Sequence, residues 1–589
     1  MNYKLYKDTN PKYSALQQVL YNRGIPIEEQ EEWLHASRED IYDYNLIDED
    51  KILQATQLLK GAIDNNEDVV TVVDADCDGY TSSAILMNYL YSRYPKWYSE
   101  HMYYIHHAGK EHGYNDVIEQ ILNIKPLIAF APDGGSNDVA AHITMFQNEI
   151  IPITLDHHDI EDVEAIKDSP AIIINVQLSN YPNKSLTGAG VTFKFCQAYE
   201  DYYFDGEDNL DWLMDLCALG NCGDMADLRE KEIRAIMNIG LNNIQNEFFK
   251  AMTEKNAYSI DKMNGINYYS MAFYVVPFIN ACVRSGTPKE KDTIFQSMLN
   301  SENRKSVPSS KRGAKGTMVP LYQEAVLVAD RVKRKQTKLQ DEAMSFLEQK
   351  IKDENLLDDA MLLLLCNPGE VEKNLAGLVA NKLQAKYQRP TAVLTRNKSK
   401  DDKEYFYRGS MRNYSLSENT DLKKTLVDTG HIEFCSGHSN AAGLGIAESE
   451  LSAFIESMNE AYKNINQEPT YYVDYIWTKD TIDSDKIIDI GGFNIYGQNI
   501  AESEVCIKDV PLDSSMITLM SREKNPTLKI QVGDVAFIKF KSSEEEFNSF
   551  CENGQTLTVI GKCQQNVWNG QVSAQIIVKD YELDEDWIF

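Results

Sequence analysis

Three short apolar runs in the first half of the chain each end in acidic or imidazole side chains. The runs are Val69–Val73, Leu127–Phe130 and Ile150–Leu155, and the groups that follow them are Asp74, Asp76, Asp78, Asp133, Asp156, His157 and His158. A helical pattern follows the first run, so strand, polar loop and helix succeed one another as in an α/β unit. Ligands of parallel sheets bind beyond the carboxyl ends of the strands, so these side chains are expected to converge at one edge.

The converging groups are carboxylates and imidazoles without a thiolate. A fourth segment, a helical run over residues 214–223, leads to one more acid, Asp224. Such a set favours Mn²⁺ or Mg²⁺ over structural zinc, and this many acids cannot all stay ionised without a cation. Two divalent ions about 4 Å apart would use the whole set. The alternative is a solvated or calcium-like loop, although no glutamate lies six residues after Gly79, so an EF-hand does not fit.

The rest of the chain suggests several domains, since 589 residues are too many for one core. Residues 1–66 have a helical pattern, a long helix connects the two halves, a second α/β unit follows, and the end alternates like an OB-type barrel. An Asn-Gly pair at 569–570 predicts a hairpin there. The expected parts are an α/β domain with a helical N-terminal segment over 1–315, a connecting helix over 316–350, a smaller α/β domain over 351–465 and the barrel over 466–589.

The charge of the chain limits its partners. The net charge is −32 and the pI about 4.7, which argues against a protein that coats nucleic acid non-specifically. Residues 304–338 reverse this balance, since this segment contains many lysines and arginines but only two acids, Glu324 and Asp330. No apolar run approaches a membrane span, no signal peptide is recognised, and the ten cysteines include no CxxC pair. A cytoplasmic location and no membrane partner are therefore expected.

The acidic segments also resemble a known family. The motifs DADCDG, PDGG, LDHH and GNCGD are similar to the four ordered motifs of the DHH phosphoesterase superfamily. The stretch CSGHSNAAG resembles the glycine-rich motif of the DHH-associated domain. Further stretches look like the RecJ single-strand exonuclease branch, namely LYNRGI, YPNKSLTGAGVTFKF, VPFINACVR, RGSMR and NVWNG. The similarity covers nearly the whole chain and implies a metal-dependent 5′-to-3′ exonuclease of single-stranded DNA in recombination, repair or replication.

The resemblance also implies roles for particular residues. The implied metal ligands, for two ions of Mn²⁺ or Mg²⁺, are Asp76, Asp78, Asp133, His157 and Asp224. Asp74 and His158 would lie beside them, His158 at the scissile phosphate, with Asp156 orienting a histidine. The implied substrate contacts are Arg284, Arg408, Ser410, Arg412, Gly437, His438 and Lys110. A monomer is expected, and its implied partners are single-stranded DNA and a single-strand binding protein or helicase.

Some positions depart from the family pattern, and other functions remain open. Ser436 replaces the first glycine of a usual pair, Asn115 replaces another glycine, and Lys110 replaces an arginine, which loses bidentate geometry. The alternatives are a hydrolase of short oligoribonucleotides or cyclic dinucleotides, an inorganic pyrophosphatase, and a non-catalytic DNA-binding scaffold. The barrel argues against the first two, and the complete set of acids argues against the scaffold.

Overall fold

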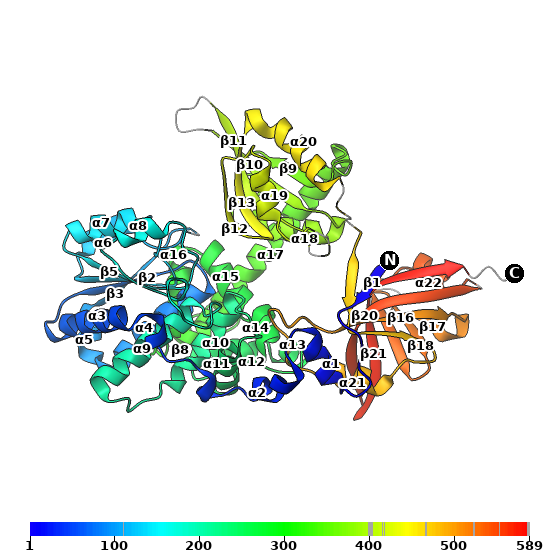
Figure 1. Ribbon diagram of the computed structural model, residues 1–589, viewed down its shortest axis with the longest axis horizontal. Helices are drawn as coiled ribbons and strands as arrows, with labels where there is room; N and C mark the ends of the chain where they lie inside the picture. Colours follow the sequence, from blue (N-terminus) through cyan, green and yellow to red (C-terminus); the bar gives the residue numbers. More distant parts are fainter. Residues whose placement is uncertain are drawn as a thin grey trace. The chain divides into compact units, whose positions relative to one another are not determined.

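The computed structural model describes residues 1–109, 111–398, 404–414, 416, 419–463, 465, 468–521, 525–552 and 554–585, without the side chains of His438 and Glu585. The chain forms two compact units. One consists of Arg23–Arg334 and Phe493–Glu502 and is called the core unit below. The other consists of Met1–Asn22, Lys335–Gly492 and Ser503–Phe589 and is called the accessory unit. Both are of the α/β or β type expected from the sequence (Figure 1).

A five-stranded parallel sheet forms the centre of the core unit, in the order β3-β2-β4-β5-β6. Its strands are β2 (Val69–Val73), β3 (Met102–His106), β4 (Ile128–Pro132), β5 (Ile151–Asp156) and β6 (Ile172–Asn175). Every residue of β2 and β4 is buried, as in parallel strands with both faces covered. The chain proceeds from β2 to β3 on one side and then to β4 on the other. The strand order therefore reverses between β2 and β4, where open α/β sheets bind ligands.

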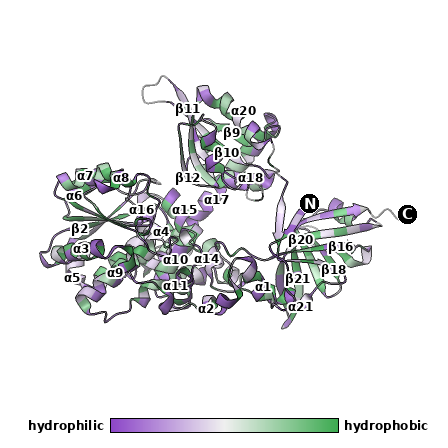
Figure 2. Ribbon diagram, in the orientation of Figure 1, coloured by the Kyte–Doolittle hydropathy of each residue, from purple (hydrophilic) through white to green (hydrophobic). Residues whose placement is uncertain are grey.

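Helices surround this sheet and extend from it. They are α2 (Gln30–Leu34), α3 (Asn45–Asp64), α4 (Cys77–Arg93), α5 (Pro95–His101), α6 (Ile118–Ile124), α7 (Val139–Gln147), α8 (Val163–Lys167), α9 (Gly188–Phe204), α10 (Met214–Gly223), α11 (Lys231–Asn242), α12 (Glu247–Lys255), α13 (Ala257–Asp261), α14 (Tyr268–Tyr274), α15 (Val276–Ser285) and α16 (Pro288–Met298). Helices α4, α9 and α10 pack on one another, and α4 is buried from Cys77 to Leu90. Helix α11 carries both hydrophobic and hydrophilic residues, as an amphipathic helix does (Figure 2).

A short hairpin precedes the long helix expected from the sequence. Its strands are β7 (Ser306–Pro308) and β8 (Met318–Pro320), and the helix is α17 (Leu321–Asp353). The polar segment SVPSSKRGAKGT, residues 306–317, begins with β7 and continues into the turn that leads to β8. The two strands were not predicted, because three-residue strands carry too little periodicity to be recognised.

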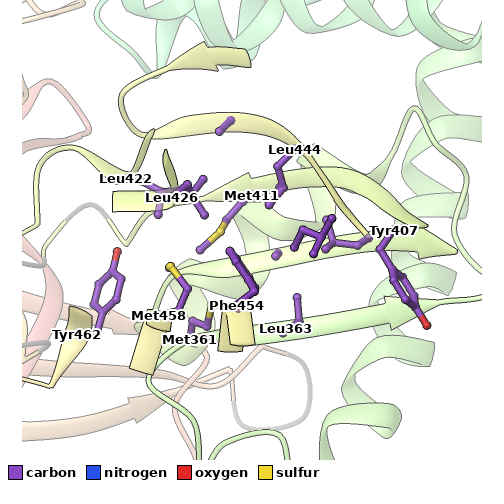
Figure 3. Close-up of a cluster of buried hydrophobic side chains, with 14 residues drawn as sticks. Met361, Leu363, Tyr407, Met411, Leu422, Leu426, Leu444, Phe454, Met458 and Tyr462 are labelled. Carbon is purple, nitrogen blue, oxygen red and sulfur yellow. The ribbon is translucent and has the colours of Figure 1, made fainter. Parts of the chain in front are cut away.

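The accessory unit contains a second α/β part, with sheet order β12-β13-β11-β10-β9. Its elements are β9 (Leu362–Cys366), α18 (Ala376–Tyr387), β10 (Thr391–Lys398), β11 (Tyr405–Arg412), α19 (Leu422–Asp428), β12 (Phe434–His438), β13 (Ala441–Ala447) and α20 (Leu451–Tyr462). One face packs its apolar side chains, among them Met411 and Leu444, against Phe454 and Met458 of α20 (Figure 3). The other face packs Leu362, Leu364 and Val393 against α17 and α18.

The C-terminal part is a seven-stranded sheet in the order β15-β16-β20-β21-β19-β18-β17. Its elements are β15 (Tyr475–Thr478), α21 (Ser484–Gly491), β16 (Glu504–Pro511), β17 (Ile517–Met520), β18 (Thr527–Val532), β19 (Val535–Phe540), α22 (Glu544–Phe550), β20 (Gln555–Trp568) and β21 (Gln571–Glu585). The predicted Asn-Gly turn joins β20 to β21, with φ of 50° at Asn569 and 79° at Gly570. Positive φ at both residues is what a two-residue hairpin turn requires.

The start of the chain differs from the expectation. The sequence predicts helices over residues 1–66, but the chain begins with β1 (Asn2–Leu5), which pairs in parallel with β14 (Thr470–Val473). Helix α1 (Ala15–Asn22) follows only after this strand. The prediction was wrong because the partner strand lies more than 460 residues away in sequence, beyond the reach of local patterns. Among the described helices, none combines the length and apolar character needed to cross a membrane.

Candidate metal centre

The acidic and imidazole side chains meet at the point where the strand order reverses. His157 Nε2 lies 3.2 Å from Asp133 Oδ1, 3.4 Å from Asp224 Oδ2 and 4.0 Å from Asp78 Oδ2. These groups follow β5, β4, α10 and β2 respectively, so four separate segments contribute. The convergence expected from the strand ends is present in the structure.

Asp133 is common to two groups of ligand atoms in the described part of the chain. Asp133, His157 and His158 offer one ligand atom each within 4.8 Å of one another, and so do Asp74, Asp76 and Asp133. A carboxylate shared by two such groups can bridge a pair of cations. The arrangement is therefore compatible with two ions, as the sequence suggests.

Two buried atoms of this centre lack hydrogen bonds among the described residues. They are Asp133 Oδ1 and His157 Nε2, which face each other at 3.2 Å. Leaving a buried polar atom without a partner costs about 1–3 kcal/mol, so a site that keeps two of them needs a reason. A cation bound by both atoms supplies one. Oxygen and imidazole donors suit Mn²⁺ and Mg²⁺, so the residues fit the implied metal.

The electrostatics of the centre also favour a cation. Burial raises the pKa of Asp78 well above its ordinary value, and the nearby charges of Asp224 and Asp76 raise it further. Burial likewise raises the pKa of Asp133, with Asp78 as its strongest charged neighbour. A divalent cation would oppose both effects and allow the carboxylates to ionise.

Asp78 is held in place by the N-terminus of α9. The amide of Gly188 donates to Asp78 Oδ2 at 2.7 Å, and the amide of Ala189 donates to Oδ1 at 3.1 Å. A helix N-terminus has free amides and a partial positive charge, so it binds a carboxylate well. The TGAG segment at 187–190 thus positions a ligand through its backbone.

Asp133 adopts an unusual backbone conformation next to the same helix. Its φ is 70°, in the left-handed region that residues other than glycine rarely adopt. A Cβ atom at Gly188 would lie 2.4 Å from Asp133 Cβ and 2.5 Å from its Oδ1. Glycine at 188 is therefore required for the close approach of α9 to this carboxylate.

Asp156 orients His158, as the sequence suggests. Its Oδ1 lies 2.8 Å from His158 Nδ1 and accepts the amide hydrogens of His157 and His158, while Oδ2 accepts the amide hydrogen of Ser136. Burial lowers the pKa of His158, but the hydrogen bond and charge of Asp156 outweigh it and bring the pKa to about 10. Burial raises the pKa of Asp156, yet its bonds to His158 hold it well below the usual range. The carboxylate of Asp156 thus fixes the ring of His158 and favours its protonated form.

The structure adds residues that sequence reasoning missed. His112 Nδ1 lies 2.5 Å from Asp74 Oδ2, and His107 Nε2 lies 3.7 Å from Asp74 Oδ1. His107 is in turn held by Asp116, at 2.7 Å through Nδ1. These histidines follow β3, a strand that was not recognised in the sequence. The sequence did offer one signal for this position, because His112 stands directly before Gly113. Lys110, the predicted substrate contact in this loop, lies outside the described residues.

A second group of predicted residues gathers in the accessory unit. Arg408, Ser410 and Arg412 alternate along β11, so they share the face opposite to buried Tyr407 and Met411. A Cβ at Gly377, near the start of α18, would lie 2.6 Å from Arg412 Nη2 and 3.4 Å from Ser410 Oγ. Ser410 and Arg412 thus reach the first turn of α18. Arg408 lies over the rings of Phe406 and Phe434.

The remaining predicted contacts are placed as follows. Gly437 on β12 has a φ of 107°, which favours glycine, and the side chain of His438 lies outside the described part of the chain. Arg284 is half-buried near the end of α15. The basic segment 304–338 has more acidic neighbours in the structure than its sequence suggests. Its cations have acidic partners in the pairs Arg304–Glu247, Lys305–Glu302, Arg331–Glu290, Arg334–Asp330 and Lys338–Glu342, among others.

Comparison with known proteins agrees with this architecture. The N-terminal domain of the DHH family matches residues 68–221, the DHHA1 domain matches 360–464 and the RecJ OB domain matches 473–580. The structure of RecJ from Thermus thermophilus in complex with Mn²⁺ has the same fold, with a TM-score of 0.70 and 17% identity. That match covers 96% of this chain and 76% of the other.

Two curated relatives from Bacillus subtilis strain 168 match along nearly the whole chain. One is the SPbeta prophage-derived protein YorK, whose name describes a single-strand DNA-specific exonuclease; it is 32% identical over 99% of this chain and 98% of its own length. The other is the single-stranded-DNA-specific exonuclease RecJ, 24% identical over 97% of this chain and 68% of its own length. Matched in all three domains and along the full length of a relative, the chain belongs to the RecJ branch of the DHH family.

Proposed function

We propose that this protein is a metal-dependent exonuclease that hydrolyses single-stranded DNA from the 5′ end toward the 3′ end. The relatives that match its full length are named as single-strand DNA-specific exonucleases. The observation that carries the proposal is the pair of buried, facing atoms without hydrogen bonds, Asp133 Oδ1 and His157 Nε2. Such a pair fits a divalent cation, and phosphodiester hydrolysis is the chemistry for which paired divalent cations are suited.

The residues proposed to hold two ions of Mn²⁺ or Mg²⁺ are Asp76, Asp78, Asp133, His157 and Asp224. When bound, these ions would lower the pKa of an attacking water and offset the negative charge of the scissile phosphate. Asp78 would meet them in a fixed orientation, because the amides of Gly188 and Ala189 donate to both of its oxygens. Asp76 is similarly oriented, because its Oδ1 accepts the amide hydrogen of Gly79 at 3.0 Å.

His158 supplies positive charge beside the ligands. Its Nδ1 is held by Asp156, and its ring centroid lies 4.6 Å from that of His157. A protonated imidazole in this position donates to a phosphate oxygen, which favours the more highly charged transition state. Asp74 contacts His112, whose ring centroid lies 6.2 Å from that of His158, and is proposed to act beside the metal ligands.

Ser410 and Arg412 are proposed to recognise the 5′ phosphate. A guanidinium fork pairs with two phosphate oxygens, and a serine hydroxyl adds a third donor. Both residues project from one face of β11 toward the start of α18, whose amides add donors. Arg284, Arg408, Gly437, His438 and Lys110 are proposed as further contacts along the nucleotide chain.

We further propose that each of the four parts of the chain has its own role. Residues 1–315 carry the chemistry, the helix over 316–350 connects, residues 351–465 read the strand end, and the OB-like part over 466–589 guides incoming DNA. The protein is proposed to act as a cytoplasmic monomer in recombination, repair or replication. Its partner would be a single-strand binding protein or a helicase.

A gel of 3′-labelled single-stranded DNA tests this function. The reaction contains Mn²⁺, Mg²⁺ or chelator, and the substrates include the same strand without a 5′ phosphate, the matched duplex and a short RNA. The proposal expects a metal-dependent ladder that shortens from the 5′ end on single strands only. Asp133→Asn should abolish it, while Asp159→Asn, an exposed aspartate on the loop after His158, should not. Cleavage confined to the short RNA, or from the 3′ end, would contradict the proposal.

A further inference from the structure

The hairpin formed by β7 and β8 carries a group of cations that the proposed chemistry does not use. Between the two strands, residues 309–317 form a closed loop. The amide of Ser309 donates to the carbonyl of Thr317 at 2.8 Å, and the amide of Gly316 donates back to Ser309 at 2.9 Å. Gly313 and Gly316 both have a φ of 85° with open space around them, so the turn itself requires glycine there.

The loop is anchored to the beginning of α17. Ser310 donates its amide hydrogen to Glu324 Oε2 at 2.8 Å, and Glu324 is almost fully buried. Lys311 donates its amide hydrogen to the buried hydroxyl oxygen of Ser309 at 3.1 Å, so the loop has internal support as well. A short loop fixed at both ends presents its side chains with little loss of conformational entropy on binding.

Three side chains at the tip of this loop are cationic and exposed: Lys311, Arg312 and Lys315. Within the part of the chain that the structure describes, none of the three has a side-chain hydrogen bond or an acidic partner within 4 Å. The cations that flank them behave differently, since Arg304 pairs with Glu247 and Arg331 pairs with Glu290. The tip therefore holds a local excess of three positive charges on a chain whose net charge is −32.

We propose that this loop is a nucleic-acid contact outside the catalytic centre, which binds the sugar–phosphate backbone of the single-stranded substrate through Lys311, Arg312 and Lys315. The proposal rests on the proposed function for the identity of the substrate. Charge complementarity selects the ligand, because a polyanion is repelled by most of this acidic surface and attracted at this loop. Unpaired cations bind phosphate without first breaking an ion pair, unlike Arg331, Arg334 and Lys338 on α17.

The proposed contact between the loop and DNA should be independent of base sequence and sensitive to salt. Lysine and arginine bind phosphate oxygens without reading base identity, so the loop should recognise single strands of any sequence. Each phosphate contact releases counterions, so its contribution to binding weakens as the salt concentration rises. On single strands the slope of log K against log salt is about −0.7 per contact. Three contacts should account for about 2 units of the slope of log K against log salt.

The test measures binding in chelator, where no hydrolysis occurs. A labelled oligothymidylate of about 30 nucleotides is titrated with protein at increasing NaCl and followed by fluorescence anisotropy. The test variant is Lys311→Ala/Arg312→Ala/Lys315→Ala. The control variant is Lys96→Ala/Lys167→Ala/Lys250→Ala, which removes the same charge from exposed lysines that are not among the proposed contacts. Thermal unfolding checks that both variants are folded.

The proposal expects the loop variant to bind about tenfold or more weakly at low salt, with a slope reduced by about 2, while the control follows the wild type. Equal affinity and slope in the loop and control variants would overturn it. If the wild type binds single strands and the loop variant does too, only this inference fails. If the wild type binds no single strand at all, the proposed function fails with it. A loop variant that loses binding to anionic vesicles but not to DNA would point to a membrane surface instead and overturn the proposal.

Discussion

At the scale of single residues, the centre depends on one glycine. Gly188 allows the N-terminus of α9 to approach Asp133 and donate to Asp78. In Gly188→Ala the new methyl group would overlap Asp133, so the ligands must shift. Displacements of about 1 Å in a catalytic site cost about 100-fold in rate. We therefore expect a loss of exonuclease activity of this order, with a weaker Mn²⁺ affinity measured by calorimetry.

The variant Gly61→Ala is the matched control for Gly188→Ala. Gly61 lies inside α3 with nothing within 4 Å of a Cβ atom. Gly61→Ala should keep full activity and stabilise the protein by about 0.5–1 kcal/mol. Full activity in Gly188→Ala would show that the close approach of α9 has no role in catalysis.

His142 on α7 predicts a pH dependence of stability. It is buried, its Nδ1 lies 2.9 Å from Ser169 Oγ, and burial lowers its pKa to about 4. In the unfolded chain the pKa returns to about 6.5, so the unfolded state binds more protons between pH 6.5 and 4. Stability should therefore fall as the pH decreases through this window, by about 3 kcal/mol at most.

The substitution His142→Gln isolates this contribution. Its free energy of unfolding, measured by urea denaturation from pH 7 to pH 4.5, should decline less than that of the wild type. His35→Gln changes a histidine whose side chain is 80% exposed and should leave the profile unchanged. Parallel profiles for wild type and His142→Gln would contradict the assignment.

At the scale of elements, a buried ion pair joins α9 to α11. Lys194 Nζ lies 3.0 Å from Glu232 Oε1, and Glu232 also accepts from the hydroxyl of Tyr181 and the amide of Asn183. Both charged side chains are at most 1% exposed. Lys194→Met leaves Glu232 charged without its cation, so it should destabilise the protein by about 3–5 kcal/mol.

Thermal unfolding of a set of variants tests this pair. The double variant Lys194→Met/Glu232→Gln removes the unpaired charge and should recover part of the loss. Lys167→Met breaks an exposed pair with Glu164 and should change stability by less than about 1 kcal/mol. If Lys194→Met were as stable as Lys167→Met, the buried pair would have no structural role.

The elements also show what local sequence can reveal. The strand Val69–Val73 was predicted with its observed bounds, because an apolar run of β-branched residues before an acidic loop has few other interpretations. Strand β3 was missed because its tyrosines and histidine alternate too weakly, and with it His112 and His107 were missed. The backbone donors of Gly188 and Ala189 were also missed, because no side-chain pattern reveals an amide that approaches from a distant helix. The domain boundaries and the roles of the site residues stay predictions.

At the scale of the whole molecule, the first residues belong to the accessory unit. Strand β1 pairs with β14, and Tyr3 and Leu5 pack against a cluster that contains Tyr471, Val473 and Ile560. Deleting residues 2–6 should therefore lower the unfolding temperature of the accessory unit and speed amide exchange in β14. Mn²⁺ affinity should not change, because all proposed ligands lie in the other unit. Unchanged exchange in β14 would contradict this account.

The central claim is that the acids and His157 at the strand ends form a metal site, and Mn²⁺ binding tests it most directly. Free Mn²⁺ is followed by electron paramagnetic resonance as protein is added, for the wild type, Asp133→Asn and Asp159→Asn. The account predicts saturable binding by the wild type and by Asp159→Asn, with two ions per chain, and affinity weaker by at least about tenfold in Asp133→Asn. Binding that is equally strong in Asp133→Asn, or absent from the wild type, would contradict it.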